Sequence, residues 1–140
     1  MAKITQIFLL ISCCLIFSCK ENKDLIIGAE RIENYYSLIK EKRVAIIGNQ
    51  TSRIGNTHIV DSLLSLDINI IKVFSPEHGF RGTEDAGAIV KDDIDKKTGL
   101  PIISLYGKNK KPYPEQLKEI DVIIFDIQDV GVRFYTYIST

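Results

Sequence analysis

The residues best suited to chemistry lie in segment 75–87, which reads SPEHGFRGTEDAG. Its ionisable side chains are those of Glu77, His78, Arg81, Glu84 and Asp85. Acidic groups at this density can transfer protons, bind a cation or accept hydrogen bonds from a hydroxylated substrate. The segment follows the apolar run 68–74, so the sequence places these groups at the end of a buried strand.

The elements that position this segment are predicted from the apolar pattern. Runs without polar alternation are typical of parallel strands covered on both faces, and they occur at 42–48, 68–74, 100–107 and 121–128. Helical spacing of apolar residues predicts helices over 29–40, 56–66 and 113–120. Asn56 or Thr57 is expected to cap the second helix, and Pro114 to lie in the first turn of the third. Strands that alternate with helices predict an open, three-layer, mostly parallel α/β sheet.

The loops after these strands carry most of the polar residues. In an open parallel sheet, the carboxyl ends of the strands meet helix N-termini at one edge, and ligands bind there. We therefore expect one site, built from four loops, at this edge. Outside segment 75–87, its polar candidates are Asn49, Gln50, Asp126, Gln128, Asp129 and Arg133.

Carboxylates are the most frequent of these groups, and they allow two kinds of chemistry. Converging acids suit work on a glycosidic bond, where one acid stays protonated while another is ionised. They equally suit a divalent metal, with His78 completing a shell of oxygen ligands. Segment 48–55 matches neither a Walker loop nor a dinucleotide fingerprint, and no serine sits in a nucleophile elbow. No cofactor is therefore predicted.

Each candidate also has a structural interpretation. Glu77 can cap the turn after its strand, and Asp126 can hold a neighbouring loop through backbone N–H groups, so both interpretations stay open. His58, in the first turn of a predicted helix, is expected to be structural. The charged stretches 91–97 and 108–111 are predicted to be solvated loops.

Composition narrows the class of protein. The 140 residues are 45% hydrophobic and 26% charged, which indicates one small folded domain. The formal net charge is zero and no basic stripe interleaves with aromatic residues, so nucleic acid is not an expected partner. All 3 cysteines lie near the N-terminus, which excludes disulfides and thiolate chemistry from the folded part.

The N-terminal segment has the layout of an export signal. Lys3 precedes an apolar run that is short for a transmembrane helix and ends in IFSC. This ending resembles the lipobox of bacterial lipoproteins, so we predict a signal peptide over 1–18, lipidation of Cys19 and a spacer over 19–27. LISC at Cys13 also fits the pattern, but cleavage there would leave apolar residues exposed. An uncleaved anchor helix is the alternative, and it predicts the same membrane tether.

Four blocks of the chain resemble one known family. GNQTS, VFSPEHGFRGTEDAG, PIISLYG and DVIIFDIQDVGVRFYTYIST occur in this order. They look like the N-terminal part of the exo-β-N-acetylmuramidase family NamZ, formerly a domain of unknown function numbered 1343. The resemblance covers about residues 28–140. It implies a glycosidase that releases N-acetylmuramic acid from the non-reducing end of peptidoglycan fragments, with a Rossmann-like N-terminal domain and a smaller C-terminal domain beside the cleft.

The resemblance also implies roles for individual residues. Glu77 matches the favoured catalytic acid and is predicted to protonate the leaving oxygen. Asp126 or Glu84 would activate water or stabilise the oxocarbenium-like transition state, and assistance by the acetamido group of the sugar is a further option. Arg81 or Arg133 is predicted to hold the lactyl carboxylate of muramic acid. The other predicted substrate-binding residues are Asn49, Gln50, His78, Gln128, Asp129 and Tyr135.

The sequence departs from the family pattern at its C-terminal end. Residues 133–140 look like the first turns of a helix, yet no cap, glycine or proline follows them. We therefore expect residues 28–140 to be the N-terminal part of a Rossmann-like catalytic domain, incomplete at the C-terminus. Such a chain would have an open sheet edge and little or no activity alone.

Three functions remain open at this point. The first is the muramidase, which would act on muramic acid glycosides from a membrane tether. The second is a non-catalytic lipoprotein that binds peptidoglycan sugars, and the third is a metal-dependent hydrolase that uses His78 with Asp126 and Asp129. Lys20 and Glu21 after the predicted lipidation site indicate an exported lipoprotein of the periplasm or outer membrane of a Gram-negative bacterium.

Overall fold

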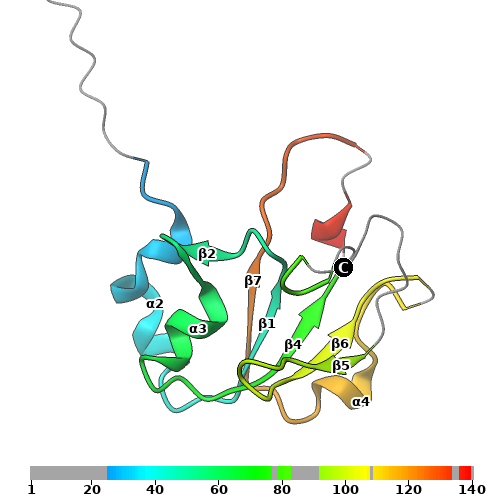
Figure 1. Cartoon of the computed structure of the whole chain (residues 1–140), viewed down its shortest axis with the longest axis horizontal. Helices are drawn as coiled ribbons and strands as arrows, with labels where there is room; N and C mark the ends of the chain where they lie inside the picture. Colours follow the sequence, from blue (N-terminus) through cyan, green and yellow to red (C-terminus); the bar gives the residue numbers. More distant parts are fainter. Residues whose placement is uncertain (1–24, 77–78, 83–91, 108, 134–135, 140) are drawn as a thin grey trace, which may run out of the picture.

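The apolar runs of the sequence form the strands of a five-stranded sheet (Figure 1). This computed structural model describes residues 25–76, 79–82, 92–107, 109–133 and 136–139. The strands are β1 (Val44–Gly48), β4 (Ile70–Ser75), β5 (Asp93–Ile94), β6 (Pro101–Ser104) and β7 (Val122–Asp126). Their order in the sheet is β5-β6-β4-β1-β7. Neighbours pair in parallel, except that β5 runs antiparallel to β6.

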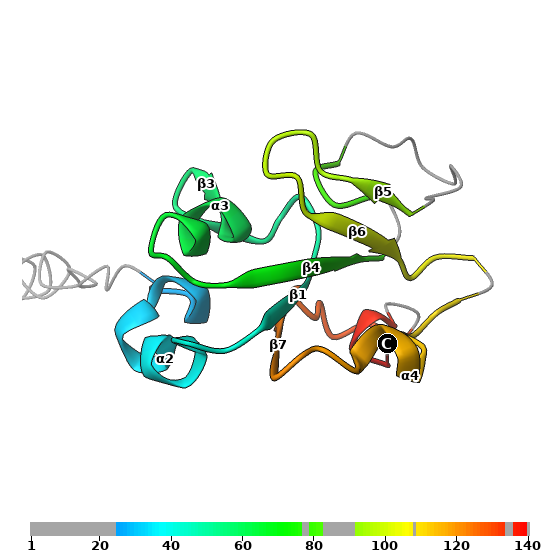
Figure 2. The same ribbon diagram turned by 90° about the horizontal axis from the view of Figure 1, so that it is seen from below.

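Helices cover both faces of this sheet. The 3-10 helix η1 (Gly28–Glu30) and the α-helices α2 (Ile32–Ile39) and α3 (Ile59–Leu64) lie on one side. The short α4 (Pro114–Leu117) and the 3-10 helix η2 (Tyr137–Ser139) lie on the other side (Figure 2), near opposite ends of the strands (Figure 1). The predicted three-layer, mostly parallel α/β fold is confirmed.

Alternate residues of β1 belong to two different hydrophobic clusters. Val44 and Ile46 pack with residues of α2 and α3, whereas Ala45 and Ile47 pack on the opposite face with Phe74 of β4. Every residue of β1 is buried, because successive side chains of a strand point to opposite faces and both faces are covered here. Burial of each large aliphatic side chain contributes about 1.5–3 kcal/mol. β1 is therefore a firm support for the loops at its end.

The chain changes direction beside β1, and this change defines the edge that carries the candidate site. From β1 the chain adds β4 and β6 on one side, and it then returns to place β7 on the other side. Gly48 at the end of β1 pairs with Asp126 at the end of β7. Leu105 N donates to Ser75 O (2.8 Å) beyond the ends of β6 and β4. The strand ends meet at one edge, as predicted, and the chain reverses its direction of strand addition between β1 and β7, the place where ligands bind in open α/β sheets.

β7 is the last strand in the order, so its outer edge has no strand partner among the described residues. Ile123 and Phe125 on this strand are 41% and 37% exposed. Both observations agree with the predicted open edge. Where β1 and β7 begin, Arg43 and Asp121 form an exposed ion pair, with Nη2 2.8 Å from Oδ1 and Nε 3.1 Å from Oδ2.

The second helix begins later than the sequence pattern predicts. Residues 53–58 form a small antiparallel hairpin before it. Its strands are β2 (Arg53–Ile54) and β3 (Thr57–His58). α3 therefore starts at Ile59, and its N-cap is His58, whose Nδ1 accepts a hydrogen bond from Val60 N (3.3 Å). The prediction of Asn56 or Thr57 as the cap is wrong, because hairpin pairing takes up the residues before His58.

The predicted solvated loop over 91–97 is wrong in its middle part. Asp93–Ile94 pair with β6 as strand β5, and Asp95 is only 5% exposed. The carboxylate of Asp95 accepts hydrogen bonds from Arg81 and Thr98, which compensate for the loss of water around its charge. Lys96 and Lys97 are exposed, as expected of the flanking residues.

Candidate functional site

Asn49 holds the turn that follows β1. Its Oδ1 accepts hydrogen bonds from Thr51 N (2.9 Å) and Thr51 Oγ1 (2.7 Å), the pattern of an Asx turn. The side chain is buried, and the carbonyl oxygen of Asn49 lies 2.9 Å from His58 Nε2. Asn49 thus stabilises the backbone at the site edge, and its predicted contact with substrate stays a prediction.

Ser52 ties this turn to the end of β7. Its Oγ donates to the carbonyl oxygen of Asp126 and accepts from Asn49 N (3.0 Å). A Cβ at Gly48 would lie 2.8 Å from Ser52 Oγ, so the close approach needs glycine at this position. The backbone of Asp126 is therefore fixed relative to β1, and sequence reasoning missed the serine that fixes it.

Asp126 shows the clearest sign of a functional site in the described part of the chain. Its Oδ2 is buried and has no hydrogen-bond partner there. Burial raises the pKa of the Asp126 carboxyl, since the charged form is disfavoured away from water. A buried oxygen without a partner lowers stability. Such groups are concentrated at functional sites, where a ligand can satisfy them.

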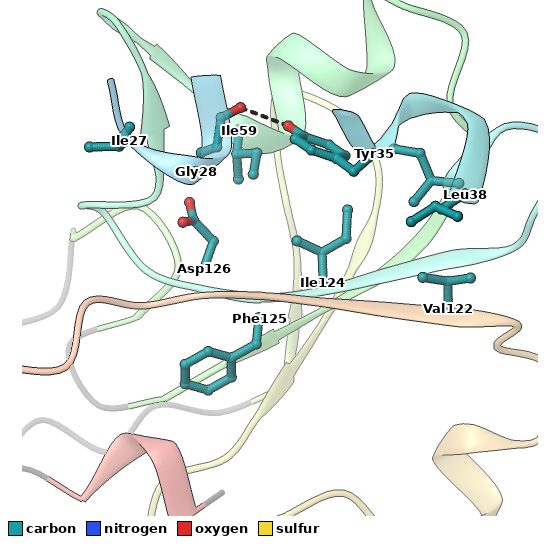
Figure 3. Close-up of a pocket in the computed structure, with 11 residues that line it drawn as sticks. Ile27, Gly28, Tyr35, Leu38, Ile59, Val122, Ile124, Phe125 and Asp126 are labelled. Atoms are coloured by element: carbon teal, nitrogen blue, oxygen red, sulfur yellow. Dashed lines mark hydrogen bonds between the residues drawn. The ribbon is translucent and has the colours of Figure 1, made fainter. Parts of the chain in front are cut away.

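The Asp126 carboxyl faces a pocket of about 370 Å³ between β7 and the helices η1 and α2 (Figure 3). The side chains of Val122 and Ile124 point to the same side of β7 as Asp126, whereas the ring of Phe125 points away. The lining is largely apolar. Small-molecule sites commonly combine an apolar wall with a few placed polar groups, and Asp126 is the acid of this one.

Tyr35 of α2 also lines this pocket. Its hydroxyl donates to Ala29 O (2.7 Å), which joins α2 to η1. Burial raises the pKa of the Tyr35 phenol, and the negative charge of Asp126 adds to this effect. The sequence predicted Tyr35 only as a residue of the helix over 29–40. Its position in the pocket could not be predicted, because it depends on how this helix packs against β7.

Arg81 is paired with two aspartates. Its Nε and Nη2 donate to Asp95 Oδ1 and Oδ2 (both 2.7 Å), while Nη1 and Nη2 donate to Asp61 Oδ2 and Oδ1 (3.1 and 3.0 Å). The Arg81 guanidinium lowers the pKa of the Asp95 carboxyl to about 2 and that of Asp61 below its ordinary value. Sequence reasoning missed both aspartates, because neither lies near Arg81 in the chain.

Phe80 and His58 pack beside this ion-pair cluster. Phe80 is 3% exposed, and its ring meets the His58 ring edge to face at 4.5 Å between centroids. Burial lowers the pKa of the His58 imidazole, which keeps the ring neutral at pH 7. The predicted structural role of His58 is confirmed by its bonds to Asn49 and Val60.

Arg81 and Asp126 do not share a pocket. Arg81 lines a second, polar pocket of about 330 Å³, together with Gln50, His58 and Asp61, and none of its lining residues lines the Asp126 pocket. Gln50 is exposed, and its side chain lies against Gly82. The remaining candidates Gln128, Asp129 and Arg133 are exposed on the loop after β7, where Asp129 Oδ1 accepts from Gly131 N (2.7 Å).

Several predicted site residues lie outside the described residues. They are Cys19, Glu77, His78, Glu84 and Tyr135. The convergence of Glu77 and Glu84 with Asp126 and Asp129 therefore stays a prediction, as does the signal peptide over 1–18. Within the ranges that the structure describes, no helix is long and apolar enough to span a bilayer. Nor do three or more metal-ligating side chains come together within those ranges.

Comparisons with known proteins agree with the sequence resemblance. Peptidoglycan beta-N-acetylmuramidase NamZ of Bacillus subtilis (strain 168) is 49% identical over 113 residues, which make up 78% of this chain and 27% of that protein. A crystal structure of a DUF1343 family protein from Bacteroides fragilis NCTC 9343 is 49% identical, with a TM-score of 0.67, over 81% of this chain and 29% of that one. A second such protein from the same organism is 42% identical, with a TM-score of 0.66, over 76% and 27%.

The chain spans little more than a quarter of the length of these relatives. Residues 44–140 match the family model described as "Exo-beta-N-acetylmuramidase NamZ, N-terminal". Since this match covers more than half of the sequence, the chain belongs to the NamZ exo-β-N-acetylmuramidase family and corresponds to its N-terminal part.

Proposed function

We propose that this chain supplies the N-terminal half of the active site of an exo-β-N-acetylmuramidase. The reaction is hydrolysis of the glycosidic bond that links a non-reducing N-acetylmuramic acid residue to a peptidoglycan fragment. Two observations support this: 49% identity to a peptidoglycan β-N-acetylmuramidase, and an acid at the sheet edge where ligands bind in this fold class. This chain covers 27% of that relative, so the whole enzyme's activity is part of the proposal.

The Asp126 carboxyl carries this proposal. A glycosidase needs two acids, one to protonate the leaving oxygen and one to activate water or to stabilise positive charge on the sugar. Asp126 has a buried oxygen without a partner and a raised pKa. Both properties suit a group that exchanges a proton with substrate or water. We assign proton donation to Glu77, by its position in the family motif, and the second role to Asp126, with Glu84 as the alternative.

Arg133 is the better of the two candidate clamps for the lactyl carboxylate. It lies exposed on the loop that follows β7, on the same strand end as Asp126. The guanidinium of Arg81 instead already binds two carboxylates in a different pocket. A planar guanidinium binds a carboxylate through two parallel hydrogen bonds, so a single free arginine can distinguish muramic acid from glucosamine.

The test uses a chimera in which this chain replaces the matching part of B. subtilis NamZ. Its substrates are a muramic-acid-terminated disaccharide and the 4-nitrophenyl glycoside of N-acetylmuramic acid. Glu77→Gln should lower kcat on the disaccharide about 100- to 10,000-fold, because the sugar leaving group needs a proton. It should lower kcat much less on the nitrophenyl glycoside, whose phenolate leaves without one. The matched control is Glu115→Gln, an exposed acid on α4.

Other outcomes of the same assay contradict the proposal. If the wild-type chimera binds the disaccharide in calorimetry but cleaves neither substrate, the chain is a binding module. If EDTA abolishes cleavage and a divalent cation restores it, the metal-dependent hydrolase is correct instead. Equal losses on both substrates in Glu77→Gln would remove residue 77 from the proton-donor role and leave that role to Asp126 or Glu84.

We also propose that the protein is exported and anchored to a membrane through lipidated Cys19, in the periplasm or outer membrane of a Gram-negative bacterium. The support is the lipobox-like ending of the apolar N-terminal run. Labelling with an alkyne fatty acid should mark the wild type and Cys13→Ser but not Cys19→Ser. Labelling of Cys19→Ser at the wild-type level would refute lipidation at this position.

A further inference from the structure

Arg81 joins three separate segments of the chain. It lies in segment 79–82, its partner Asp61 lies on α3, and its other partner Asp95 follows β5. We propose that Arg81 is a positioning residue, which holds segment 79–82, directly after Glu77 and His78 in the sequence, in place by binding Asp61 and Asp95 at the same time. This inference rests on the proposed function, since it assigns a purpose to the placement of Glu77.

The geometry of the two ion pairs favours fixation over simple charge compensation. Each carboxylate accepts two hydrogen bonds from the guanidinium, at 2.7–3.1 Å. Two-point pairing sets the angle as well as the distance, which a lysine ammonium cannot do. The side chains of Arg81, Asp61 and Asp95 are 25%, 12% and 5% exposed, so water screens these pairs less than it screens a surface pair.

Neighbouring residues fix the same segment by packing. Phe80 is buried in the hydrophobic cluster on the α2 and α3 side of the sheet, where its ring contacts the His58 ring. The Arg81 guanidinium lies 4.8 Å from the centroid of the Phe80 ring. A Cβ at Gly82 would lie 2.8 Å from Gln50 Cβ, so the segment also touches the turn after β1. Three consecutive residues are thus tied to three different parts of the fold.

This fixed segment begins beside the predicted proton donor. Residues 77 and 78 lie between Pro76, which is fully buried, and Gly79, whose N–H donates to Pro76 O (3.3 Å). Loss of the Arg81 pairs would free the chain only two residues after this bond. Misplacement of a reacting group by about 1 Å can lower a rate about 100-fold. The ion pairs therefore act on catalysis through position, without touching the substrate.

The charge of the cluster opposes the alternative role, in which Arg81 binds the lactyl carboxylate. Arg81 carries one positive charge against two negative charges from Asp61 and Asp95, and Lys97 adds one positive charge at 2.7 Å from Asp61. The four charges sum to zero. An incoming anion would gain no net attraction, and it would have to displace a carboxylate that already has ideal geometry.

The kinetic test uses the chimera with the variants Arg81→Lys, Arg81→Gln and Asp95→Asn. Positioning predicts that all three lower kcat about 10- to 100-fold on the disaccharide with KM within about twofold of wild type, and that Arg81→Lys does not rescue. Arg43→Gln is the matched control, because it breaks a bidentate pair at the opposite end of the strands and should leave kcat unchanged. The proposal is overturned if Arg81→Gln raises KM while Asp95→Asn leaves both kcat and KM at the wild-type values. Arg81 would then be a substrate contact.

A second measurement needs no activity and uses the 140-residue chain itself. In Arg81→Gln and in Asp95→Asn, the Gly79 amide should exchange at least about tenfold faster through a local opening, which depends little on urea, whereas amides of the β1–β7 ladder should exchange only through global unfolding. Unchanged exchange at Gly79 would overturn the positioning role, whatever the kinetics show. Accelerated exchange together with an inactive wild-type chimera would instead leave the anchoring intact and refute the proposed function.

Discussion

Asp95 and Asp126 both lie at strand ends of one sheet, and the protein treats their charges in opposite ways. Asp95 is buried yet accepts hydrogen bonds from Arg81 and Thr98, and the pairing with Arg81 lowers its pKa to about 2. Asp126 is partly buried, but its Oδ2 is fully buried without a partner among the described residues, and its pKa is raised. Burial alone therefore does not set the protonation of an acid, and its partners decide the direction.

The contrast separates a structural cluster from a candidate reactive group. A fully paired cluster stabilises one arrangement of the chain, whereas an unpaired buried acid destabilises the fold and is retained where a ligand uses it. This contrast supports our proposals that the Arg81 cluster fixes segment 79–82 and that the Asp126 pocket receives the substrate. Substitutions in the Arg81 cluster should therefore lower the stability of the fold, whereas substitution of Asp126 should lower activity without lowering stability.

The largest effect on stability is expected for Arg81→Met. Removal of the guanidinium leaves the carboxylates of Asp61 and Asp95 facing each other without a cation between them, which should cost about 3 kcal/mol. Urea denaturation of the 140-residue chain at pH 7, followed by circular dichroism, measures this loss. Lys97→Met removes only the exposed cation of the cluster and should shift the midpoint far less. Equal shifts in the two variants would show that the cluster is not the stabilising unit.

Acid should weaken the same cluster in a defined pH range. The folded-state pKa of Asp95 is about 2, below the ordinary value of 3.8, so its ionised form contributes stability above about pH 4. This contribution is lost as the pH falls from about 4 to about 2. The difference in melting temperature between wild type and Asp95→Asn should therefore be largest at pH 6 and shrink towards zero at pH 2. A difference that stays constant over this range would contradict the pairing.

Asp126→Asn should have the opposite sign. The folded-state pKa of Asp126 is raised, so the folded chain binds the proton more tightly than the unfolded chain, and stability falls as the pH rises above about 4. At pH 7 the neutral amide should therefore raise the melting temperature of the chain. In the chimera it should lower kcat at least about 100-fold, since an amide cannot accept a proton.

Asp129→Asn is the control for this change, because Asp129 is exposed on the following loop. Its melting temperature should match that of wild type at both pH 3 and pH 7. A destabilised Asp126→Asn at pH 7 would mean that the carboxylate is satisfied in solution, and the comparison with Asp95 would then lose its basis.

The sheet was predictable because its strands obey a local rule. β1, β4 and β7 lie in largely apolar runs, and such runs indicate strands of a parallel sheet, although one face of β7 is partly exposed. The small hairpin before α3 was not predictable, since its strands have only two residues each and carry no period. Strand β5 was missed for the same reason and because its charged residues indicated a solvated loop.

The candidate site was predictable in outline but not in its pairings. The sheet edge and Asp126 followed from the order of strands and from the polar residues after them. The pairing of Arg81 with Asp61 and Asp95 depends on residues 20 and 14 positions away, which only the folded chain brings together. Nothing in the sequence distinguishes Asp95, which is paired, from its exposed neighbour Asp93.

The smallest effect is expected for Asp121→Asn, which tests whether geometry or burial makes an ion pair matter. Asp121 and Arg43 have the same two-point pairing as Asp95 and Arg81, but their side chains are 35% and 49% exposed. Arg43 lowers the pKa of the Asp121 carboxyl, yet water and salt screen an exposed pair, and the asparagine still accepts from Arg43 N. In 0.15 M salt, the denaturation midpoint of Asp121→Asn should therefore stay close to that of wild type. The shift of this midpoint should be smaller than the shift that Asp95→Asn causes. If the two shifts are equal, two-point geometry alone stabilises the pairs, and the protected position of Asp95 adds nothing.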